Sequence, residues 1–135
     1  MKKLILASSI LLLSGCQSPI DDMLNNQFMT TTPQEPPAEI QKIWVGNMGP
    51  YLASIKFEKN GSGLFCYSYG TSNVIQKIKY SDRIIYIQDG TKLTVSSLEE
   101  DKFIGSSEYF AGESYTFYAD SNLTNSSVYC SKELH

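Results

Sequence analysis

Regular alternation of apolar and polar residues, interrupted by two-residue turns, is the feature that most constrains how this chain can fold. Residues 51–58 carry an apolar side chain at every second position. A period of two predicts a β-strand that is buried on one face only. The Asn60-Gly61 pair that follows is typical of a tight hairpin, because both residue types accept a positive φ. The sequence therefore predicts paired antiparallel strands.

The same arrangement continues to the end of the chain, and Asp89-Gly90 provides a second hairpin signal of the same kind. The expected strands are residues 43–45, 51–58, 64–69, 74–80, 83–88, 92–96, 102–106, 114–119 and 127–131. Short strands joined by tight turns favour a meander, and closure removes the two edges that an open sheet would expose. We therefore predict an all-β fold, either a small antiparallel up-and-down β-barrel or a strongly curled meander. A two-sheet sandwich is the alternative.

The first 16 residues have a different character. A basic start is followed by a short apolar run that ends at Leu13-Ser14-Gly15-Cys16. The run has about 10 residues, whereas a membrane-spanning helix needs about 20. This layout is typical of a secretory signal, with an incidental cysteine or a soluble N-terminal helix as the alternatives. The tetrapeptide resembles the lipobox of bacterial lipoproteins.

That resemblance implies cleavage of residues 1–15 as a signal peptide, diacylglycerol on the thiol of Cys16 and acylation of its new amine. Several acyl chains on one residue would anchor the protein stably to a membrane, since each buried CH₂ contributes about 0.8 kcal/mol. The residue after Cys16 is Gln17 rather than Asp. By resemblance to the enterobacterial sorting rule, this favours the outer membrane, on its periplasmic face or at the surface, over the inner membrane.

Residues 16–41 are expected to be the lipidated cysteine and a flexible linker, which makes a disordered N-terminal tether. The segment is polar and rich in proline, so it cannot bury enough apolar surface to offset chain entropy. A spacer is the favoured interpretation, and a partner-binding segment that uses Phe28 and Met29 is the alternative. Residues 42–135 then form the β-barrel-like domain.

The charge balance restricts the possible partners. The chain has 11 basic and 14 acidic residues, for a net charge of −3. Loss of Lys2 and Lys3 with the leader leaves 9 basic residues against 14 acidic ones, so the mature chain carries −5. This balance argues against nucleic acid as a partner, because phosphate binding needs a basic face. It also argues against electrostatic attraction to anionic lipid, so the lipid on Cys16 is the expected membrane contact.

Two cysteines remain after Cys16 is assigned to lipid. An even number in an exported chain predicts a disulfide between Cys66 and Cys130, with two buried free thiols as the alternative. Such a bond closes a loop of about 64 residues and contributes about 4 kcal/mol on the chain-entropy model. Metal binding by this pair is not expected, because no Cys-x-x-Cys spacing or nearby histidine completes a site.

The sequence contains no recognisable catalytic set. His135 is the only histidine and the last residue, so the usual general base for a nucleophile is missing. Ser62 lacks the Gly-x-Ser-x-Gly setting of a nucleophile elbow, and residues 99–101 are expected to form a solvated acidic turn. Glu108 and Glu113 could pair across a loop. We expect a non-enzyme without metal or cofactor.

A second resemblance lies at the start of the predicted barrel. It consists of Trp44-Val45-Gly46, the apolar positions Ile55 and Phe57, and the turn Asn60-Gly61-Ser62-Gly63. These residues resemble the opening of small lipocalin-like β-barrel lipoproteins of unknown function. The resemblance implies a barrel and the carriage of a small apolar ligand. The order of glycine and tryptophan is the reverse of that in the lipocalin signature.

A binding surface is the favoured function. Tyr109 and Phe110 lie together in a predicted loop, where aromatic side chains are suited to an interface. We expect a lipid-anchored, non-catalytic binding or interaction module of the cell envelope with an envelope protein as a possible partner. The alternatives are an inhibitor or immunity-type protein against a lysozyme or toxin, and a lipocalin-like carrier.

Overall fold

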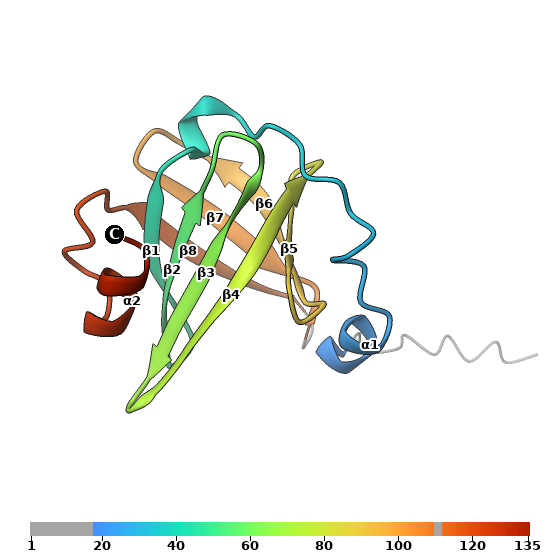
Figure 1. Cartoon of the computed structure of the whole chain (residues 1–135), viewed down its shortest axis with the longest axis horizontal. Helices are drawn as coiled ribbons and strands as arrows, with labels where there is room; N and C mark the ends of the chain where they lie inside the picture. The colour runs from blue at the N-terminus through green and yellow to red at the C-terminus, as the bar shows by residue number, and fades with distance from the viewer. Residues whose placement is uncertain (1–17, 110–111) are drawn as a thin grey trace, which may run out of the picture.

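Eight antiparallel strands close on themselves into a barrel in which each strand pairs with the next and β8 pairs with β1 (Figure 1). The structure, a computed structural model, describes residues 18–109 and 112–135. The strands are β1 (Ile43–Met48), β2 (Tyr51–Phe57), β3 (Ser62–Tyr69), β4 (Ser72–Ser81), β5 (Ile84–Ile87), β6 (Lys92–Leu98), β7 (Lys102–Ser107) and β8 (Glu113–Ala119). This topology confirms the predicted all-β up-and-down barrel and excludes the sandwich alternative.

Alternation along the strands separates an inner from an outer face, as expected for a barrel. On β2, Ala53, Ile55 and Phe57 point inward and are buried. The main core combines such positions from all eight strands with one residue that precedes β1. Its buried members are Ile40, Trp44, Ala53, Ile55, Phe57, Phe65, Ile78, Tyr80, Ile85, Ile87, Leu93, Val95, Phe103 and Phe117.

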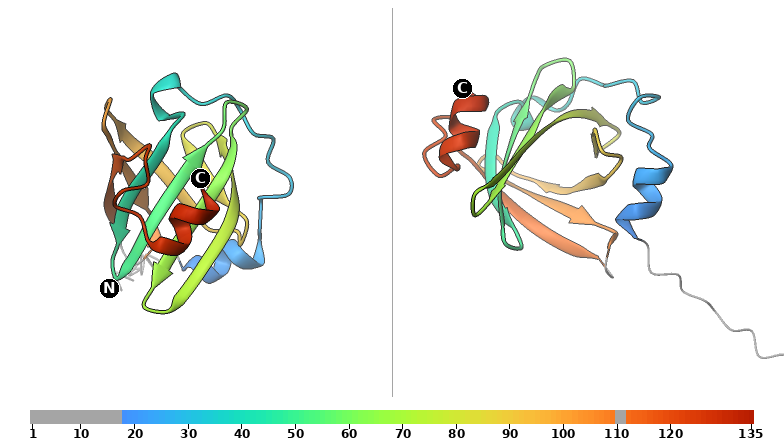
Figure 2. Two further views of the ribbon diagram at one scale, coloured as in Figure 1. Left: turned by 60° about the vertical axis from the view of Figure 1, so that its left-hand side comes forward. Right: turned by 60° about the horizontal axis from the view of Figure 1, so that its bottom comes forward.

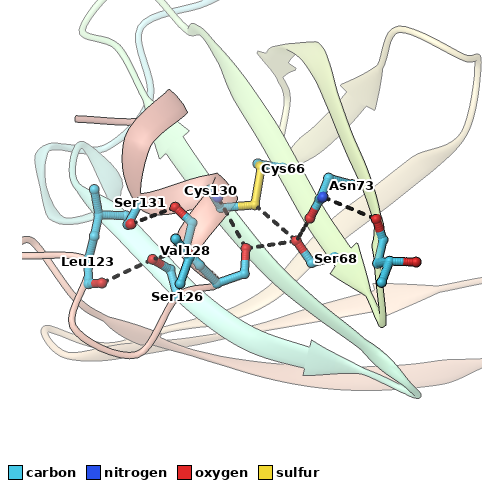
Figure 3. Close-up of a disulfide and its surroundings, with 10 residues drawn as sticks. Cys66, Ser68, Asn73, Leu123, Ser126, Val128, Cys130 and Ser131 are labelled. Carbon is cyan, nitrogen blue, oxygen red and sulfur yellow. Dashed lines mark hydrogen bonds between the residues drawn. A yellow bond between two sulfur atoms is a disulfide. The ribbon is translucent and has the colours of Figure 1, made fainter.

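A second, smaller core lies on the outer face of the barrel. Cys66 on β3 packs there with Leu123, Cys130 and Leu134 from the C-terminal segment. Cys66 and Cys130 form the predicted disulfide, with 5.7 Å between their Cα atoms. Figure 3 shows this bond joining the C-terminal helix to β3. The disulfide and the apolar contacts fix the end of the chain against the barrel wall.

The expected strand at residues 127–131 is wrong, because this segment forms helix α2 (Val128–Glu133) instead. Ser127 caps the helix, and its hydroxyl accepts a hydrogen bond of 3.1 Å from the backbone N–H of Cys130. A serine cap satisfies a donor that a helix start would otherwise leave free. The barrel is already closed by β8, so no sheet edge remains for a ninth strand.

The expectation of a flexible linker is also wrong for the described part of that segment, residues 18–41. Helix α1 (Pro19–Leu24) lies beside one end of the barrel, and the short 3₁₀ helix η1 (Ala38–Ile40) covers the other. The chain between them passes along the barrel wall beside β4 and β5, and α1 and α2 lie on opposite sides of the barrel (Figures 1 and 2). We call residues 18–41 the strap.

Specific contacts hold the strap in place. Phe28 is buried, and the ammonium group of Lys79 lies 4.5 Å from the centre of its ring and donates to its carbonyl. Further along, the backbone N–H of Gln34 donates a 2.8 Å hydrogen bond to the carbonyl of Tyr80. Composition predicted solvation, but one buried aromatic and several long-range hydrogen bonds order the segment.

Candidate functional site

The inside of the barrel is packed at one end. The ring of Trp44 meets the ring of Phe103 edge-on at 5.0 Å, and Phe103 stacks on Phe117 at 4.8 Å. The indole N–H of Trp44 donates to the carbonyl of Ile40 in η1. Aromatic pairs in these geometries stabilise a core beyond the area they bury. We refer to this as the closed end, because side chains fill it.

A cavity of about 350 Å³ occupies the other end, which we call the open end. Its volume is at the lower end of the roughly 300–1,000 Å³ of small-molecule sites. Most of its lining is apolar or aromatic. The lining residues are Pro19, Met23, Met48, Tyr51, Phe65, Tyr67, Gln76, Ile87, Asp89, Thr91, Lys92, Leu93, Ser107, Tyr109 and Tyr115. The interior of the barrel is therefore packed at one end and hollow at the other.

Glycine and small residues on the strands decide where the inside of the barrel is filled. A Cβ atom on Gly105 would lie 2.6 Å from Cδ2 of Leu93, so glycine is needed there for Leu93 to fill the interior. Ser107, two residues further along β7, is also buried but short, and it lines the cavity. The inward-facing side chain at Ser107 is therefore too short to fill the barrel, and the packed core gives way to the cavity at this position of β7.

The polar groups of the cavity are largely engaged with one another. Asp89 accepts hydrogen bonds of 2.9 and 2.6 Å from the N–H and hydroxyl of Thr91, and its own N–H donates to Gln76. Burial, and then the negative charge of Asp89, raise the pKa of Tyr67. The lining hydroxyl of Tyr67 therefore stays protonated at neutral pH and is available as a hydrogen-bond donor.

Tyr115 lies on β8 at the same end. Its hydroxyl donates a 2.6 Å hydrogen bond to the carboxylate of Glu113. Burial of the ring, and then this bond, raise the pKa of Tyr115 to about 12. Glu113, which sequence reasoning offered as one half of a carboxylate pair with Glu108, is thus engaged by a neighbouring tyrosine.

Helix α1 is clamped to this end by a group of three side chains. The hydroxyl of Tyr109 donates to Oδ2 of Asp22 at 2.6 Å and accepts from the backbone N–H of Lys92 at 2.9 Å. The ammonium group of Lys92 lies 3.6 Å from Oδ1 of Asp22. Burial, and then the bond to Asp22, raise the pKa of Tyr109 well above its ordinary value. We call these three residues the α1 clamp.

The turn between β5 and β6 is shaped to receive α1. A Cβ atom on Gly90 would lie 2.5 Å from the carbonyl oxygen of Asp22 and 2.9 Å from Cα of Met23. Next to it, the side-chain amide of Asn26 donates to the carbonyl of Gln88. The predicted Asp89-Gly90 hairpin thus has a second role, because only glycine allows the helix to approach this closely.

The site residues expected from the sequence have different outcomes. Tyr109 does line the cavity, but it lies partly buried in the α1 clamp rather than exposed in a loop. Phe110, the other member of the candidate binding loop, and Cys16, the expected lipidation site, lie outside the described residues. The expected disulfide between Cys66 and Cys130 is present.

Sequence reasoning missed the contribution of the strap to the cavity. Pro19 and Met23 line it, although both lie in the segment expected to be a solvated linker. Ser18 caps α1 by accepting from the N–H of Ile20, and Pro19 occupies the first turn. A serine followed by proline is a start signal for a helix, and it could have located α1.

Within residues 18–109 and 112–135, no group of three or more His, Cys, Asp or Glu side chains is placed to hold a metal ion. None of the helices in these same ranges has the length and apolar character needed to span a membrane.

One comparison with known proteins gives a match. The model of a family described as "Bacterial lipocalin LPS transport optimiser YedD" matches residues 25–134, which is most of the chain. No curated protein and no solved structure matches. The family assignment therefore rests on the family model, and it agrees with the closed eight-stranded barrel.

Proposed function

The chain belongs to the YedD family of bacterial lipocalins, described as LPS transport optimisers, and from this premise we propose that it assists lipopolysaccharide transport as a non-catalytic, lipid-anchored binding protein of the envelope. Its working part is the open end of the barrel. The single observation that carries the proposal is the cavity of about 350 Å³ with a mainly apolar and aromatic lining.

The lining indicates the class of ligand. Met48, Phe65, Ile87 and Leu93 supply apolar surface, and tyrosine hydroxyls supply a few polar contacts. A site of this kind gains most of its affinity from the burial of apolar surface. The cavity has room for one acyl chain or a similar apolar group and is too small for a glycolipid with several chains. We therefore propose a single acyl chain as the ligand.

The anchor is the second part of the proposal. Residues 1–15 would be removed as a signal peptide, and lipid on Cys16 would hold the mature chain to the membrane. The residue after the cysteine, Gln17, supports the outer membrane as the destination. Metabolic labelling with a fatty-acid probe tests this step, and the Cys16→Ser variant should lose both the label and its membrane fractionation. Labelling of that variant would overturn the anchor.

The binding step has a matched pair of variants. Met48 lines the cavity, whereas Met29 lies on the strap with 81% of its surface exposed. Met48→Trp fills the cavity, so binding of dodecanoate, measured by displacement of a hydrophobic fluorophore, should weaken about tenfold or more. Met29→Trp should bind like the wild type. Equal binding by both variants would exclude the cavity as the ligand site.

The link to transport is tested in cells. A strain that lacks the protein should show reduced lipopolysaccharide at its surface, and the wild-type chain should restore it. If the cavity serves this process, Met48→Trp should restore less than Met29→Trp at equal protein levels. Full restoration by both variants would leave the family role intact and remove the cavity from it.

A further inference from the structure

Helix α1 leaves part of its apolar surface in solvent while one of its acidic side chains faces the barrel. Asp22 faces the barrel, and its side chain is only 16% exposed in the α1 clamp, while Pro19 and Met23 line the cavity. On the opposite face, Ile20 and Leu24 are 62% and 78% exposed. A helix that packs on a soluble protein normally places its apolar residues against the core and its charges in water. Within the described residues, these two apolar side chains are left in contact with solvent.

More apolar surface lies across the cavity from α1. Tyr51, which lines the cavity, begins β2, and its ring lies 5.4 Å from the ring of Tyr69 at the end of β3. Both tyrosines are exposed. Met23 on α1 and Tyr51 both line this cavity, and α1 packs on the β5–β6 turn at Gly90 whereas Tyr51 begins β2, so the two lie on different parts of its rim. Tyrosine is enriched where a protein surface meets the polar boundary of a bilayer.

The short stretch of chain between Cys16 and α1 limits how far this rim can lie from a membrane that holds the lipid on Cys16. Only Gln17 separates Cys16 from Ser18, which caps α1. A chain extends at most about 3.6 Å per residue, so the Cα atoms of Cys16 and Ser18 are no more than about 7 Å apart. Lipid on Cys16 would hold α1 at the bilayer surface. From Ser18 onward no free spacer precedes the barrel, because α1 is held by the α1 clamp and the strap from Asn26 to Gln34 is bound to the barrel wall.

The charges at this end indicate which lipid surface it fits. Asp21, Glu108 and Glu113 are exposed near the open end, and the mature chain is acidic overall. An anionic surface would repel these groups within a Debye length of about 8 Å at physiological ionic strength. The contact is therefore apolar, and it suits a surface of zwitterionic lipid.

We infer that the exposed face of α1, together with Tyr51 and Tyr69, is a membrane-docking surface that seats the open end of the barrel on zwitterionic lipid. This inference rests on the lipid anchor of the proposed function. The anchor supplies the affinity, and the helix, which would be only marginally stable alone, sets the orientation because the clamp holds it. The apolar face would lie roughly 5–10 Å into the boundary between headgroups and acyl chains.

Quenching of tryptophan by brominated lipid tests this orientation. The chain from Cys16 onward is coupled through the Cys16 thiol to a maleimide lipid in phosphatidylcholine vesicles, since the other two cysteines are bonded to each other. Leu24→Trp places a probe on the docking face. Lys59→Trp places one on the exposed β2–β3 turn at the closed end. Trp44 is fully buried and contributes the same background to both.

Bromine near the head of the acyl chain should quench the emission of Leu24→Trp and leave Lys59→Trp unchanged. Bromine near the chain end should quench Leu24→Trp less. Equal quenching of the two variants, or quenching of neither, would overturn the inference. Added anionic lipid should not increase the quenching, and an increase would contradict the apolar nature of the contact.

Chemical coupling separates this result from the proposed function. It places the anchor at Cys16 whether or not the cell adds lipid there, so a failed labelling experiment leaves this test valid. Binding of dodecanoate is measured on uncoupled protein and does not depend on docking. With the probe moved to Ile20→Trp on the same face, Leu24→Ser should reduce quenching by brominated lipid while leaving dodecanoate binding at the wild-type level.

Discussion

The hydroxyl of Tyr109 donates a 2.6 Å hydrogen bond to the carboxylate of Asp22, although 87 residues separate the two in the sequence. This bond joins the end of β7 to α1 and so connects the N-terminal strap to the open end of the barrel. The same hydroxyl accepts from the N–H of Lys92. This tyrosine thus links α1 to both β6 and the segment that follows β7.

Tyr109→Phe should release α1 without unfolding the barrel. A hydrogen bond to a charged group contributes about 1.5–3 kcal/mol when buried, and partial exposure reduces this. Exchange of the Asn25 amide, which donates to the carbonyl of Asp21 within α1, should become about tenfold faster by hydrogen–deuterium exchange. Tyr118→Phe, on the exposed outer face of β8, is the control and should leave this amide unaffected.

Gly90→Ala should displace α1, whereas Gly70→Ala should not. Both glycines have positive φ, so both variants lose some stability through backbone strain. Only Gly90 lies against α1, since no atom lies within 4 Å of a Cβ placed on Gly70. Limited proteolysis within the strap should become faster in Gly90→Ala alone. Equal cleavage of the two variants would show that α1 does not need this close approach.

Removal of the disulfide should destabilise the whole fold. It closes a loop with a sequence separation of 64 residues, so Cys66→Ala/Cys130→Ala should lower the free energy of unfolding by about 4 kcal/mol. Urea unfolding of the wild type with and without reductant gives an independent value. Agreement between the two supports the loop-closure account, and an unchanged midpoint in both would contradict it.

The closed end should provide much of the core stability. Phe103 is fully buried between Trp44 and Phe117, so Phe103→Ala should cost about 3–5 kcal/mol in urea unfolding. The emission of Trp44, the only tryptophan, should shift to longer wavelength as water enters. Ile104→Ala, on the outward face of the same strand, is the control and should cost much less.

Alkaline pH should act through Tyr115, whose pKa is raised to about 12. A raised pKa means that the folded state retains the proton longer than the unfolded chain, in which tyrosine titrates near 10. The stabilisation is therefore complete below pH of about 10 and is lost as the pH rises through about 12. Titration of phenolate absorbance should show late ionisation of both Tyr115 and Tyr109, whose pKa is also raised, and Tyr115→Phe should remove the part that belongs to one tyrosine.

Local patterns in the sequence predicted the barrel well. Alternation in β2 and the turns at Asn60-Gly61 and Asp89-Gly90 depend on the conformations of a few neighbouring residues, which are readable without tertiary information. The pairing of Cys66 with Cys130 was predictable because only two cysteines remained once Cys16 was assigned to lipid.

Apart from the Ser18-Pro19 start signal of α1, the same reasoning could not predict the strap. Its composition is that of a linker, and its order comes from partners distant in the sequence, such as Tyr109 for Asp22 and Tyr80 for Gln34. Helix α2 was missed for a related reason, since β-prone residues at 128–130 lie where no strand edge was available. Contacts between residues that are distant in the sequence override local propensity in both segments.

The sequence by itself determined the all-β class, the order of the strands and the single disulfide, because period-two patterning, turn chemistry and cysteine count act over short distances. Only the tertiary structure decided which end of the barrel is hollow and that α1 stands at that end. Those features depend on how side chains such as Leu93 and Ser107 fill a shared interior, and on a hydrogen bond across 87 residues. Packing of this kind is a property of the closed barrel as a whole.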